Sequence, residues 1–365
     1  MNDLPMVSII IPSLNEENFI YKCLDSIVAN DYPADRLEVL VVDGMSSDRT
    51  PAIVEEYAQR FGFIRLLQNP RQVTPVAFNL GIQHSRGELI MIMSAHAAYA
   101  PDAIRKCVKY SKLYNAANVG GKLKIEARAD TMFSKAAVVA LSNRFGVGGA
   151  EYRTTADETP RWVDTAAFGC YRREVFERIG PYNEQLVHCQ DFELNLRLRK
   201  SGCPTLLAPD VVITYFARTE LRSFFKRAMR GGDGVVRAFA CSTCMPVRWR
   251  HLVPLMFVSS ILVSALLAAF LPAFAWLLAG ILVLYAGANL AASLRAAYKA
   301  REPRLLLCLP AAFAVLHIAY GIGSLKACAK LAAMGKLGNF FLLGWRQATS
   351  DSSQSGSIPA RPVRE

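Results

Sequence analysis

The longest uncharged stretch of the chain is Leu252–Leu294, 43 residues without an acidic or basic side chain. A helix needs about 20 apolar residues to cross a bilayer, so this run is twice the required length. Pro272 divides it into two predicted spans, Leu252–Leu271 and Ala273–Leu294, and Leu305–Leu325 is just long enough for a third. A large buried helical core is the alternative, but core helices are rarely apolar all round over such a length. We therefore expect a membrane domain with about three transmembrane helices.

Positive charge gathers just before this apolar region. The chain carries a formal net charge of +12. Between residues 218 and 250, only Glu220 and Asp233 oppose the basic side chains Arg218, Arg222, Lys226, Arg227, Arg230, Arg237, Arg248 and Arg250. Basic residues that flank a span stay cytoplasmic and attract anionic head groups. Nucleic acid is the other partner of a basic segment. No nucleic-acid-binding motif accompanies this one, so we expect a membrane partner and no nucleic acid.

The compartment follows from the same features. The start, Met1–Pro5, lacks a basic region and a long apolar core, so we expect no cleaved signal peptide. Nine cysteines, an odd number without framework spacing, fit a reducing compartment. We expect a multi-pass protein of the plasma (inner) membrane with its large N-terminal domain in the cytoplasm. A third span would place the C-terminus outside, whereas Lys326 and Lys330 argue against that. Leu331–Trp345 then either lies in the interface or turns back.

Short apolar runs alternate with helical segments in the first hundred residues. The alternation predicts right-handed crossovers and a mostly parallel sheet in an α/β fold. The predicted strands are Val7–Ile11, Glu38–Val42, Phe63–Leu67 and Leu89–Met93. The predicted helices are Asn15–Asn30, Pro51–Phe61 and Thr74–His84. Pro12 is expected to stop the first strand, and the acidic residues after Asn15 to open the first helix.

The predicted strand Glu38–Val42 runs directly into two carboxylates, Asp43 and Asp48. Open α/β sheets bind ligands at the carboxyl ends of their strands, where such groups can meet a base, a ribose or a metal ion. A turn followed by a helix N-cap at Asp48 is the structural alternative. The crevice is not a common dinucleotide or phosphate-loop site, because the chain has neither glycine fingerprint. We interpret Gly231–Gly234, in the basic segment, as a flexible joint.

Three segments resemble the motifs of the family 2 glycosyltransferases, which have the GT-A fold. Pro12–Glu17 is similar to the family's nucleotide loop, Val41–Thr50 matches its second motif, and Phe78–Ile82 matches the helix that follows. The resemblance covers about Val7–Pro209, and the three motifs in order are highly specific. It implies a nucleotide-sugar-binding domain with a mostly parallel central sheet.

The resemblance also implies site residues for the sugar donor. The implied nucleotide-sugar-binding residues are Pro12, Ser13, Asn15, Glu16, Asp43, Arg71 and Ser94. Asp43 would hydrogen-bond uracil or another base, and Arg71 would meet the diphosphate. A charged diphosphate in a crevice needs cations and backbone donors. Helix capping is the alternative role of Asn15 and Glu16, and it is compatible with the first.

The family usually carries Asp-x-Asp after the fourth strand, where it holds a divalent metal on the diphosphate. Here the segment is Ser94-Ala-His96. It resembles the Asp-x-His of succinoglycan-type exopolysaccharide glucosyltransferases, which gives His96 the metal-ligand position for Mn²⁺ or Mg²⁺. Imidazole suits manganese, whereas hard oxygen ligands suit magnesium. Ser94 brings no charge, which implies weaker metal binding or an impaired enzyme. A histidine without a ligand role is the alternative.

Gln190-Asp191-Phe-Glu193 resembles the family's Glu-Asp-x-Asp, in which the second residue is the general base. An acceptor hydroxyl that attacks the anomeric carbon needs a base within hydrogen-bond reach. A metal offsets the charge that grows on the departing diphosphate. A single displacement inverts the anomeric centre. The alternatives for Asp191 are a helix N-cap or an ion pair with Arg197 or Arg199.

Together these features predict four segments: a GT-A domain (1–217), a basic interfacial linker (218–251), a membrane domain (252–345) and a disordered tail (346–365). The predicted function is that of a membrane-bound inverting hexosyltransferase in exopolysaccharide or envelope glycan synthesis. It would move a sugar, glucose from UDP-glucose, to a lipid-linked acceptor such as a polyprenyl diphosphate sugar. The alternatives are a catalytically weak nucleotide-sugar-binding scaffold and a processive synthase. The chain lacks the Gln-x-x-Arg-Trp motif of processive family members.

Overall fold

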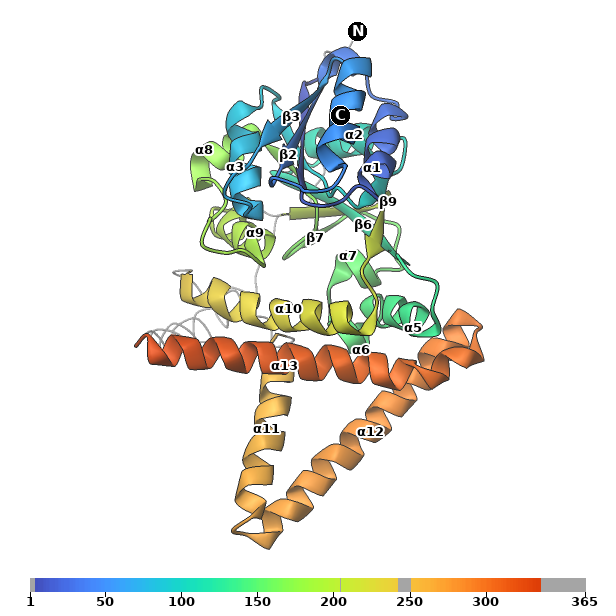
Figure 1. Ribbon diagram of the computed structural model, residues 1–365, viewed down its shortest axis with the longest axis vertical. Helices are drawn as coiled ribbons and strands as arrows, with labels where there is room; N and C mark the ends of the chain where they lie inside the picture. The colour runs from blue at the N-terminus through green and yellow to red at the C-terminus, as the bar shows by residue number, and fades with distance from the viewer. Residues whose placement is uncertain (1–3, 204, 242–250, 336–365) are drawn as a thin grey trace. The chain divides into compact units, whose positions relative to one another are not determined.

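The computed structural model describes residues 4–203, 205–241 and 251–335, which form two compact units. The first, residues 4–126 and 151–216, is α/β, and the second, residues 127–150 and 217–335, is helical (Figure 1). Residues 127–150 thus group with the C-terminal helices, although in the sequence they lie between the two parts of the α/β unit. The predicted tail, residues 346–365, lies outside the described residues.

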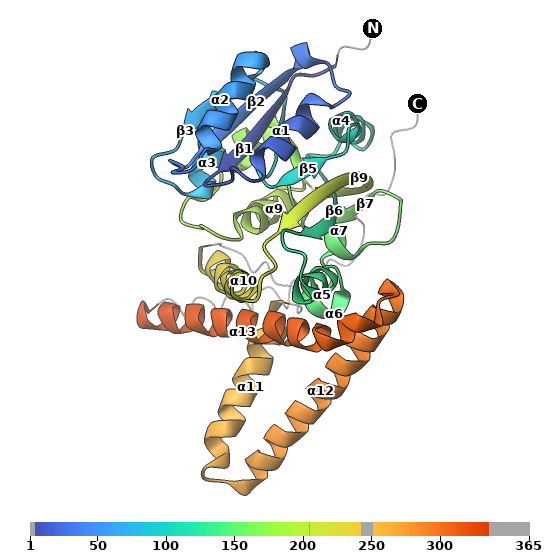
Figure 2. The ribbon, with the colours of Figure 1, turned by 45° about the vertical axis from the view of Figure 1, so that its right-hand side comes forward.

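The α/β unit is built on one mixed sheet with the strand order β3-β2-β1-β4-β8-β6-β9-β5, and β7 pairs with β9 (Figure 2). Its strands are β1 Val7–Ser13, β2 Leu37–Asp43, β3 Ile64–Gln68, β4 Leu89–Ile92, β5 Ala97–Tyr99, β6 Asn118–Ala127, β7 Arg161–Val163, β8 Cys170–Arg172 and β9 Thr205–Ala217. The first four strands pair in parallel, as predicted for this part of the chain. From β8 onwards the strands add antiparallel pairs, which the sequence pattern does not indicate.

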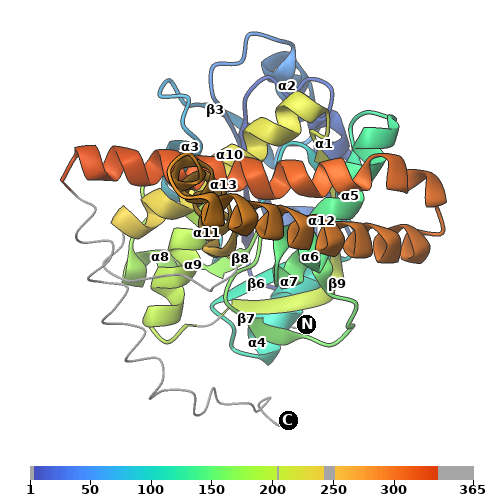
Figure 3. The same cartoon turned by 90° about the horizontal axis from the view of Figure 1, so that it is seen from below.

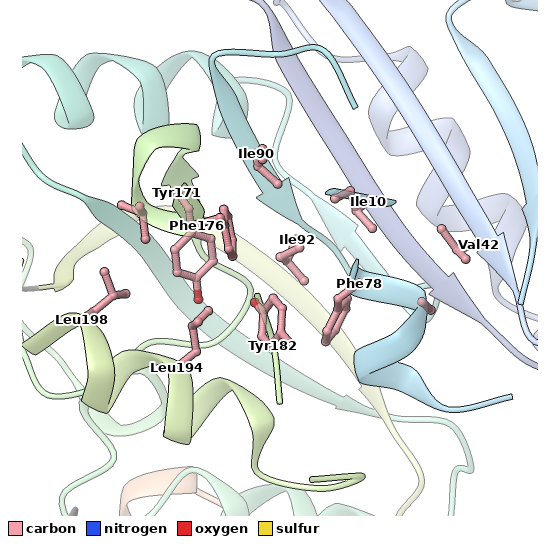
Figure 4. Packing of buried hydrophobic residues seen from close by; sticks show 12 residues of the cluster. Ile10, Val42, Phe78, Ile90, Ile92, Tyr171, Phe176, Tyr182, Leu194 and Leu198 are labelled. Atoms are coloured by element: carbon pink, nitrogen blue, oxygen red, sulfur yellow. The ribbon is translucent and has the colours of Figure 1, made fainter. Parts of the chain in front are cut away.

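Helices connect these strands and cover the sheet. They are α1 Ile20–Val28, η1 Ala34–Arg36, α2 Thr50–Arg60, α3 Thr74–His84, α4 Ala103–Leu113, α7 Glu151–Thr154, α8 Arg173–Ile179 and α9 Gln190–Lys200. The bounds of α3 equal the predicted ones. The core between sheet and helices includes Ile10 of β1, Phe78 of α3, Tyr171 of β8 and Leu194 of α9 (Figure 4). Because both faces of β1, β2 and β4 are covered, these strands read as continuous apolar runs.

Pro12 does not stop the first strand, which continues to Ser13. The β1–β4 pairing ends at Ile10 and Ile92, whereas the β1–β2 pairing continues to Ser13 and Asp43. The Ile10 carbonyl points toward the β4 side, where it accepts from the Met93 N–H. The backbone groups of successive strand residues point to opposite sides, so those of Pro12, two residues later, also face the β4 side. The pairing with β4 has already ended there. The missing proline N–H therefore costs no sheet hydrogen bond.

The predicted helix Asn15–Asn30 is wrong at its start, because α1 begins only at Ile20. Asn15 has a left-handed φ of 52°, which a helix start does not allow. Its neighbours bond instead to the loop after β2: the Glu16 N–H donates to Thr50 Oγ1 at 2.9 Å. The Glu17 N–H donates to Asp48 Oδ2 at 3.1 Å. These side-chain acceptors replace the helical hydrogen bonds.

The helical unit contains α5 Met132–Leu141, α6 Arg144–Val147, α10 Leu221–Cys241, α11 Val253–Ala268, α12 Pro272–Ala300, η3 Pro303–Leu307 and α13 Leu309–Ala333. Helix α10 lies along α13, and α11 and α12 form a hairpin that leaves α13 (Figures 1 and 2). Of the helices in the described ranges, α12 and α13 are long and apolar enough to cross a membrane. Helix α11 has 16 residues, fewer than the predicted span Leu252–Leu271.

The Gly231–Gly234 segment is not a joint, because it lies inside α10. A Cβ atom on Gly232 would collide with the carbonyl oxygen of Tyr320 on α13. In the same way, a Cβ atom on Gly323 of α13 would collide with the carbonyl oxygen of Met229 on α10. The glycines therefore let the two helix backbones approach closely. The sequence does not indicate this role, because α10 and α13 are far apart in the chain.

We predict that Gly323→Ala destabilises the helical unit by about 1–3 kcal/mol, since the new methyl group must push α10 and α13 apart. Gly280→Ala is the matched control, because no atom of the described residues lies within 4 Å of a Cβ atom there and alanine favours helix. Thermal unfolding of both variants in detergent, followed by circular dichroism, measures the difference. Equal transition temperatures would contradict the close α10–α13 packing.

Candidate active site

The carboxyl ends of β1 and β2 are joined through the buried carboxylate of Asp43. It accepts hydrogen bonds from Ser13 Oγ at 3.1 Å, from Ser46 Oγ at 2.6 Å and from the Ser46 N–H at 2.8 Å. A carboxylate offers about four lone-pair sites, so these three donors leave room for a further one. Asp43 therefore holds the two loops together and retains acceptor capacity for a ligand.

A second set of contacts locks the loop after β1 onto the loop after β2. The Asn15 N–H donates to Ser46 Oγ at 2.8 Å, and Asn15 Oδ1 accepts from the Ser47 N–H at 2.9 Å. Asp48 Oδ1 accepts from the Thr50 N–H at 2.9 Å, where α2 begins. Asp48 thus forms the expected Asx-type turn, but the N-cap residue of α2 is Arg49 and not Asp48. The structure brings Ser13, Asn15 and Asp43 together at one edge of the sheet.

His96, which follows β4, lies between two partners. Its Nδ1 atom is 3.0 Å from Glu16 Oε1, and its Nε2 atom is 3.0 Å from the hydroxyl of Tyr215 on β9. The ring of Tyr215 stacks on that of Phe168, with centroids 5.8 Å apart. Glu16 is buried, and the His96 side chain is 26% exposed. Sequence reasoning missed Tyr215, because it does not lie in a recognised motif.

Ser94 is buried and serves the turn between β4 and β5. Its hydroxyl accepts from the His96 N–H at 3.4 Å, and its own N–H donates to the Tyr99 hydroxyl at 3.0 Å. These contacts hold the backbone that presents His96. The serine thus supports His96 without supplying a charge.

Glu16 and His96 form a donor pair that fits a divalent ion. No cluster of three or more His, Cys, Asp or Glu suited to a metal occurs in the described part of the chain. Mg²⁺ is commonly bound by only one or two carboxylates together with substrate phosphates. Neighbouring ligands at about 2.1 Å from an octahedral ion are about 3 Å apart, which is the separation of the two atoms here. With Nε2 bonded to Tyr215, Nδ1 is the nitrogen that would face the ion.

Asp191 sits in the first turn of α9, beside the aromatic pair Tyr171 and Tyr182 that Figure 4 shows near Leu194. Its carboxyl group is buried, although the residue as a whole is partly exposed. Burial raises the pKa of Asp191 to about 6, and the neighbouring Tyr182 hydroxyl offsets part of the rise. A base with such a pKa is ionised at neutral pH and can take up a proton.

Glu193, two residues later, has a different environment. Its two oxygens accept from the Arg197 guanidinium at 2.8 and 2.9 Å. Arg197 also donates to the carbonyl oxygens of Ile179, Gly180 and Pro181. The ion pair considered for Asp191 thus belongs to Glu193, which ties α9 to the loop before it.

Arg71 forms an ion pair with Glu184, which also accepts from Asn79 Nδ2 at 3.0 Å. The Arg71 side chain is 62% exposed. In this structure it links the loop after β3 to the segment before α9. A role on the diphosphate requires this pair to open.

The sheet connects the parts of the site. Strand β4, which leads to His96, lies between β1 and β8, and the Ile92 N–H donates to the Gly169 carbonyl beside Phe168. Asn195 of α9 donates to the Ala166 carbonyl at 3.5 Å, which brings the helix of Asp191 to the same segment. Asp43, His96 and Asp191 are thus carried by neighbouring strands and by a helix packed on them.

Comparisons with known proteins agree with this arrangement. Residues 8–180 match the family model for glycosyl transferase family 2. Succinoglycan biosynthesis protein ExoA of Rhizobium meliloti is 27% identical over 86% of this chain and 92% of its own length. Dolichyl N-acetyl-alpha-D-glucosaminyl phosphate 3-beta-D-2,3-diacetamido-2,3-dideoxy-beta-D-glucuronosyltransferase of Methanococcus voltae is 29% identical over 62% of this chain and 71% of its own.

A solved structure shows the same fold. The mannosyltransferase PcManGT of Pyrobaculum calidifontis, in complex with GDP-mannose and Mn²⁺, superposes with a TM-score of 0.58. The likeness covers 89% of this chain and 88% of that one, with 23% sequence identity. The expected GT-A fold is therefore confirmed, with a mixed sheet in place of a mostly parallel one.

We predict that Asp191→Asn stabilises the protein at pH 7–8. The raised pKa means that the folded state holds a proton on Asp191 between about pH 4 and 6, where the unfolded chain has lost it. Stability therefore falls as pH rises through this window, by at most about 3 kcal/mol, and the loss persists above it. Asparagine removes that loss, so the gain should vanish below pH 4. Thermal unfolding from pH 4 to 8 measures it.

Glu193→Gln is the control for this prediction, because it breaks a buried ion pair two residues away. It should lower the transition temperature at pH 7. A higher transition temperature for Glu193→Gln, or a lower one for Asp191→Asn at pH 7, would contradict the environments described for these two carboxylates.

Proposed function

The chain belongs to glycosyl transferase family 2 through residues 8–180, and we propose that it is a membrane-bound inverting hexosyltransferase. The donor is a nucleotide sugar, for which we favour UDP-glucose. The acceptor is a lipid-linked sugar such as a polyprenyl diphosphate sugar. The product feeds an exopolysaccharide or a related envelope glycan.

The observation that carries this proposal is the buried Asp191 carboxylate on a helix packed against the strands of a family 2 domain. The relatives support the acceptor class. ExoA matches over almost its whole length and is named for succinoglycan biosynthesis. The Methanococcus voltae relative is named for a dolichyl phosphate sugar, which is also lipid-linked. Helices α12 and α13, with the relatives' lipid-linked chemistry, support a place at the plasma membrane, with the α/β unit in the cytoplasm.

In the proposed mechanism, Asp43 and Ser13 hold the nucleoside at the ends of β1 and β2, with Asn15 keeping the loop in shape. The acceptor hydroxyl attacks the anomeric carbon opposite the nucleotide and gives its proton to the Asp191 carboxylate. Glu16 and His96 would hold a divalent ion, which, when bound, would offset the charge on the departing diphosphate. Tyr215 fixes the His96 ring for this role.

We predict that Asp191→Asn lowers sugar transfer by roughly a hundredfold or more, because the amide cannot accept the proton. Membranes with labelled UDP-glucose and a lipid extract measure transfer as label in the organic phase. Calorimetry with UDP should show donor binding within a few fold of wild type. Asp35→Asn is the control, since this carboxylate is on the surface in η1. Wild-type transfer should also fall as pH drops below about 6.

Two outcomes would separate the alternatives. Label that stays in the aqueous phase with every nucleotide sugar, while UDP still binds, would support the non-catalytic scaffold. Label in long polymers would support a processive synthase. Sugar transfer at the wild-type rate by Asp191→Asn would show that Asp191 is not the general base.

We predict that Glu16→Gln and His96→Ala each weaken Mn²⁺ binding about tenfold or more in the presence of UDP. Electron paramagnetic resonance of free Mn²⁺ measures this with purified full-length protein, independently of turnover. His84→Ala is the control for adventitious binding, because this exposed histidine on α3 bonds through its ring to the Leu80 carbonyl of its own helix. Unchanged affinity in both variants would mean that Glu16 and His96 form an ion pair without a metal role.

A further inference from the structure

The α11–α12 hairpin exposes an apolar surface that soluble proteins do not tolerate. Side chains along both helices and in the turn between them are more than half exposed, among them Leu266 (67%), Phe270 (76%), Trp276 (80%) and Leu284 (77%). Exposed apolar surfaces of this extent mark contact with a protein partner or a membrane. Because the sequence from Leu252 to Leu294 is uncharged, the matching environment is hydrocarbon.

The turn between the two helices is as apolar as the helices themselves. Residues 268–273 read Ala-Ala-Phe-Leu-Pro-Ala, without a polar side chain. A turn can stay in hydrocarbon only if its backbone polar groups are satisfied inside the protein. The N–H groups of Phe270 and Leu271 both donate to the Leu267 carbonyl, at 3.0 and 2.9 Å. Pro272 has no N–H to satisfy. The N–H groups of Phe270 and Leu271 are thus satisfied inside the protein, as hydrocarbon requires.

Two lengths limit how deep this turn can lie. Helix α11 has 16 residues, which is about 24 Å at 1.5 Å per residue. On α12, the Tyr285 hydroxyl is 3.0 Å from Nδ1 of His317 on α13, so side chains of the two helices meet about 13 residues, or ~20 Å, after Pro272. The hydrocarbon core of a bilayer is about 30 Å thick. Helix α11 is therefore shorter than the hydrocarbon core, and the contact between α12 and α13 lies ~20 Å from the turn.

Basic residues mark both bases of the hairpin. Arg250 precedes α11 in the sequence, and Arg295, Lys299 and Arg301 follow the uncharged part of α12. Such residues stay on the cytoplasmic side. Both bases thus belong to the same face of the membrane.

Helix α13 lies along α10, and the α11–α12 hairpin leaves it, as Figures 1 and 2 show and as Figure 3 shows from below. The face of α13 that is exposed carries Ile318 and Ile322, followed by Lys326 and Lys330. His317 Nε2 lies 2.8 Å from the Phe145 carbonyl of α6, which holds α13 to the other helices of the unit. The exposed face is thus apolar in the middle of the helix and basic toward its C-terminal end.

We propose that α11 and α12 form a re-entrant hairpin, which enters the bilayer from the cytoplasmic face and turns back within the hydrocarbon at Phe270–Pro272. Helices α10 and α13 lie along the same interface. The inference rests on the proposed membrane association and replaces the three crossings expected from hydropathy. It also places Lys326 and Lys330 on the cytoplasmic side, which three crossings do not.

Site-directed labelling tests the position of the turn. Phe270→Cys and the control Tyr298→Cys, whose native side chain is 88% exposed beyond Arg295, are treated with a membrane-impermeant maleimide. Spheroplasts expose the outer face and inverted vesicles the cytoplasmic face, and peptide mass mapping separates each site from the native cysteines. We expect the thiol of Tyr298→Cys to react in inverted vesicles alone. We expect the thiol of Phe270→Cys to react in neither preparation until detergent is added.

A second variant is needed because a thiol in a tight turn can react poorly with the maleimide even when it is in water. Phe270→Asp places a charge in hydrocarbon if the turn is buried, and should weaken retention in carbonate-washed membranes about a hundredfold, with no such effect of Tyr298→Asp. Labelling of Phe270→Cys in spheroplasts, or full retention of Phe270→Asp, would show a crossing hairpin and overturn the inference. Labelling of Phe270→Cys in inverted vesicles without detergent would place the hairpin outside the bilayer and overturn it too. The lipid-extract transfer assay reports separately on the proposed catalytic activity.

Discussion

The buried carboxylate of Asp43 is the contact on which the candidate active site depends. It joins the ends of two parallel strands by accepting from Ser13 and Ser46, and Ser46 in turn accepts from the backbone of Asn15. This clamp keeps the loop after β1 out of helical geometry until Ile20. The delayed helix start lets Glu16 reach His96, which follows the next strand. Asp43 thus shapes the site whether or not it also touches the base.

The parts of the fold that the sequence predicts are those set by local chemistry. Apolar runs identify β1 to β4, and α3 is bounded by a threonine–proline start and a serine end. The Asn15–Glu17 segment has the composition of a helix start, but its partners lie about 30 residues away in the loop after β2. Motif resemblance identifies His96 and Asp191 as candidates. It cannot identify Tyr215, because that pairing exists only after β9 has folded against β5.

The helical unit shows the same limit on a larger scale. Hydropathy finds the apolar segments, but depth in a bilayer depends on helix length and on which residues meet. The Tyr285–His317 contact links α12 to α13 through side chains well before the end of α12. The glycines of α10 and α13 look like flexible positions in the sequence, whereas in the structure they allow two backbones to touch. Both features require knowledge of the partner helix.

Asp191 and Glu193 show how one helical turn can give two carboxylates opposite roles. Glu193 has a guanidinium that satisfies both oxygens, so its charge stabilises the attachment of α9. Burial dominates at Asp191, so its charge is unfavourable and its pKa is raised. A residue whose ionised form destabilises the fold is hard to explain by structure alone. It is readily explained if the ionised form must take a proton from a substrate, because proton affinity is what a base needs.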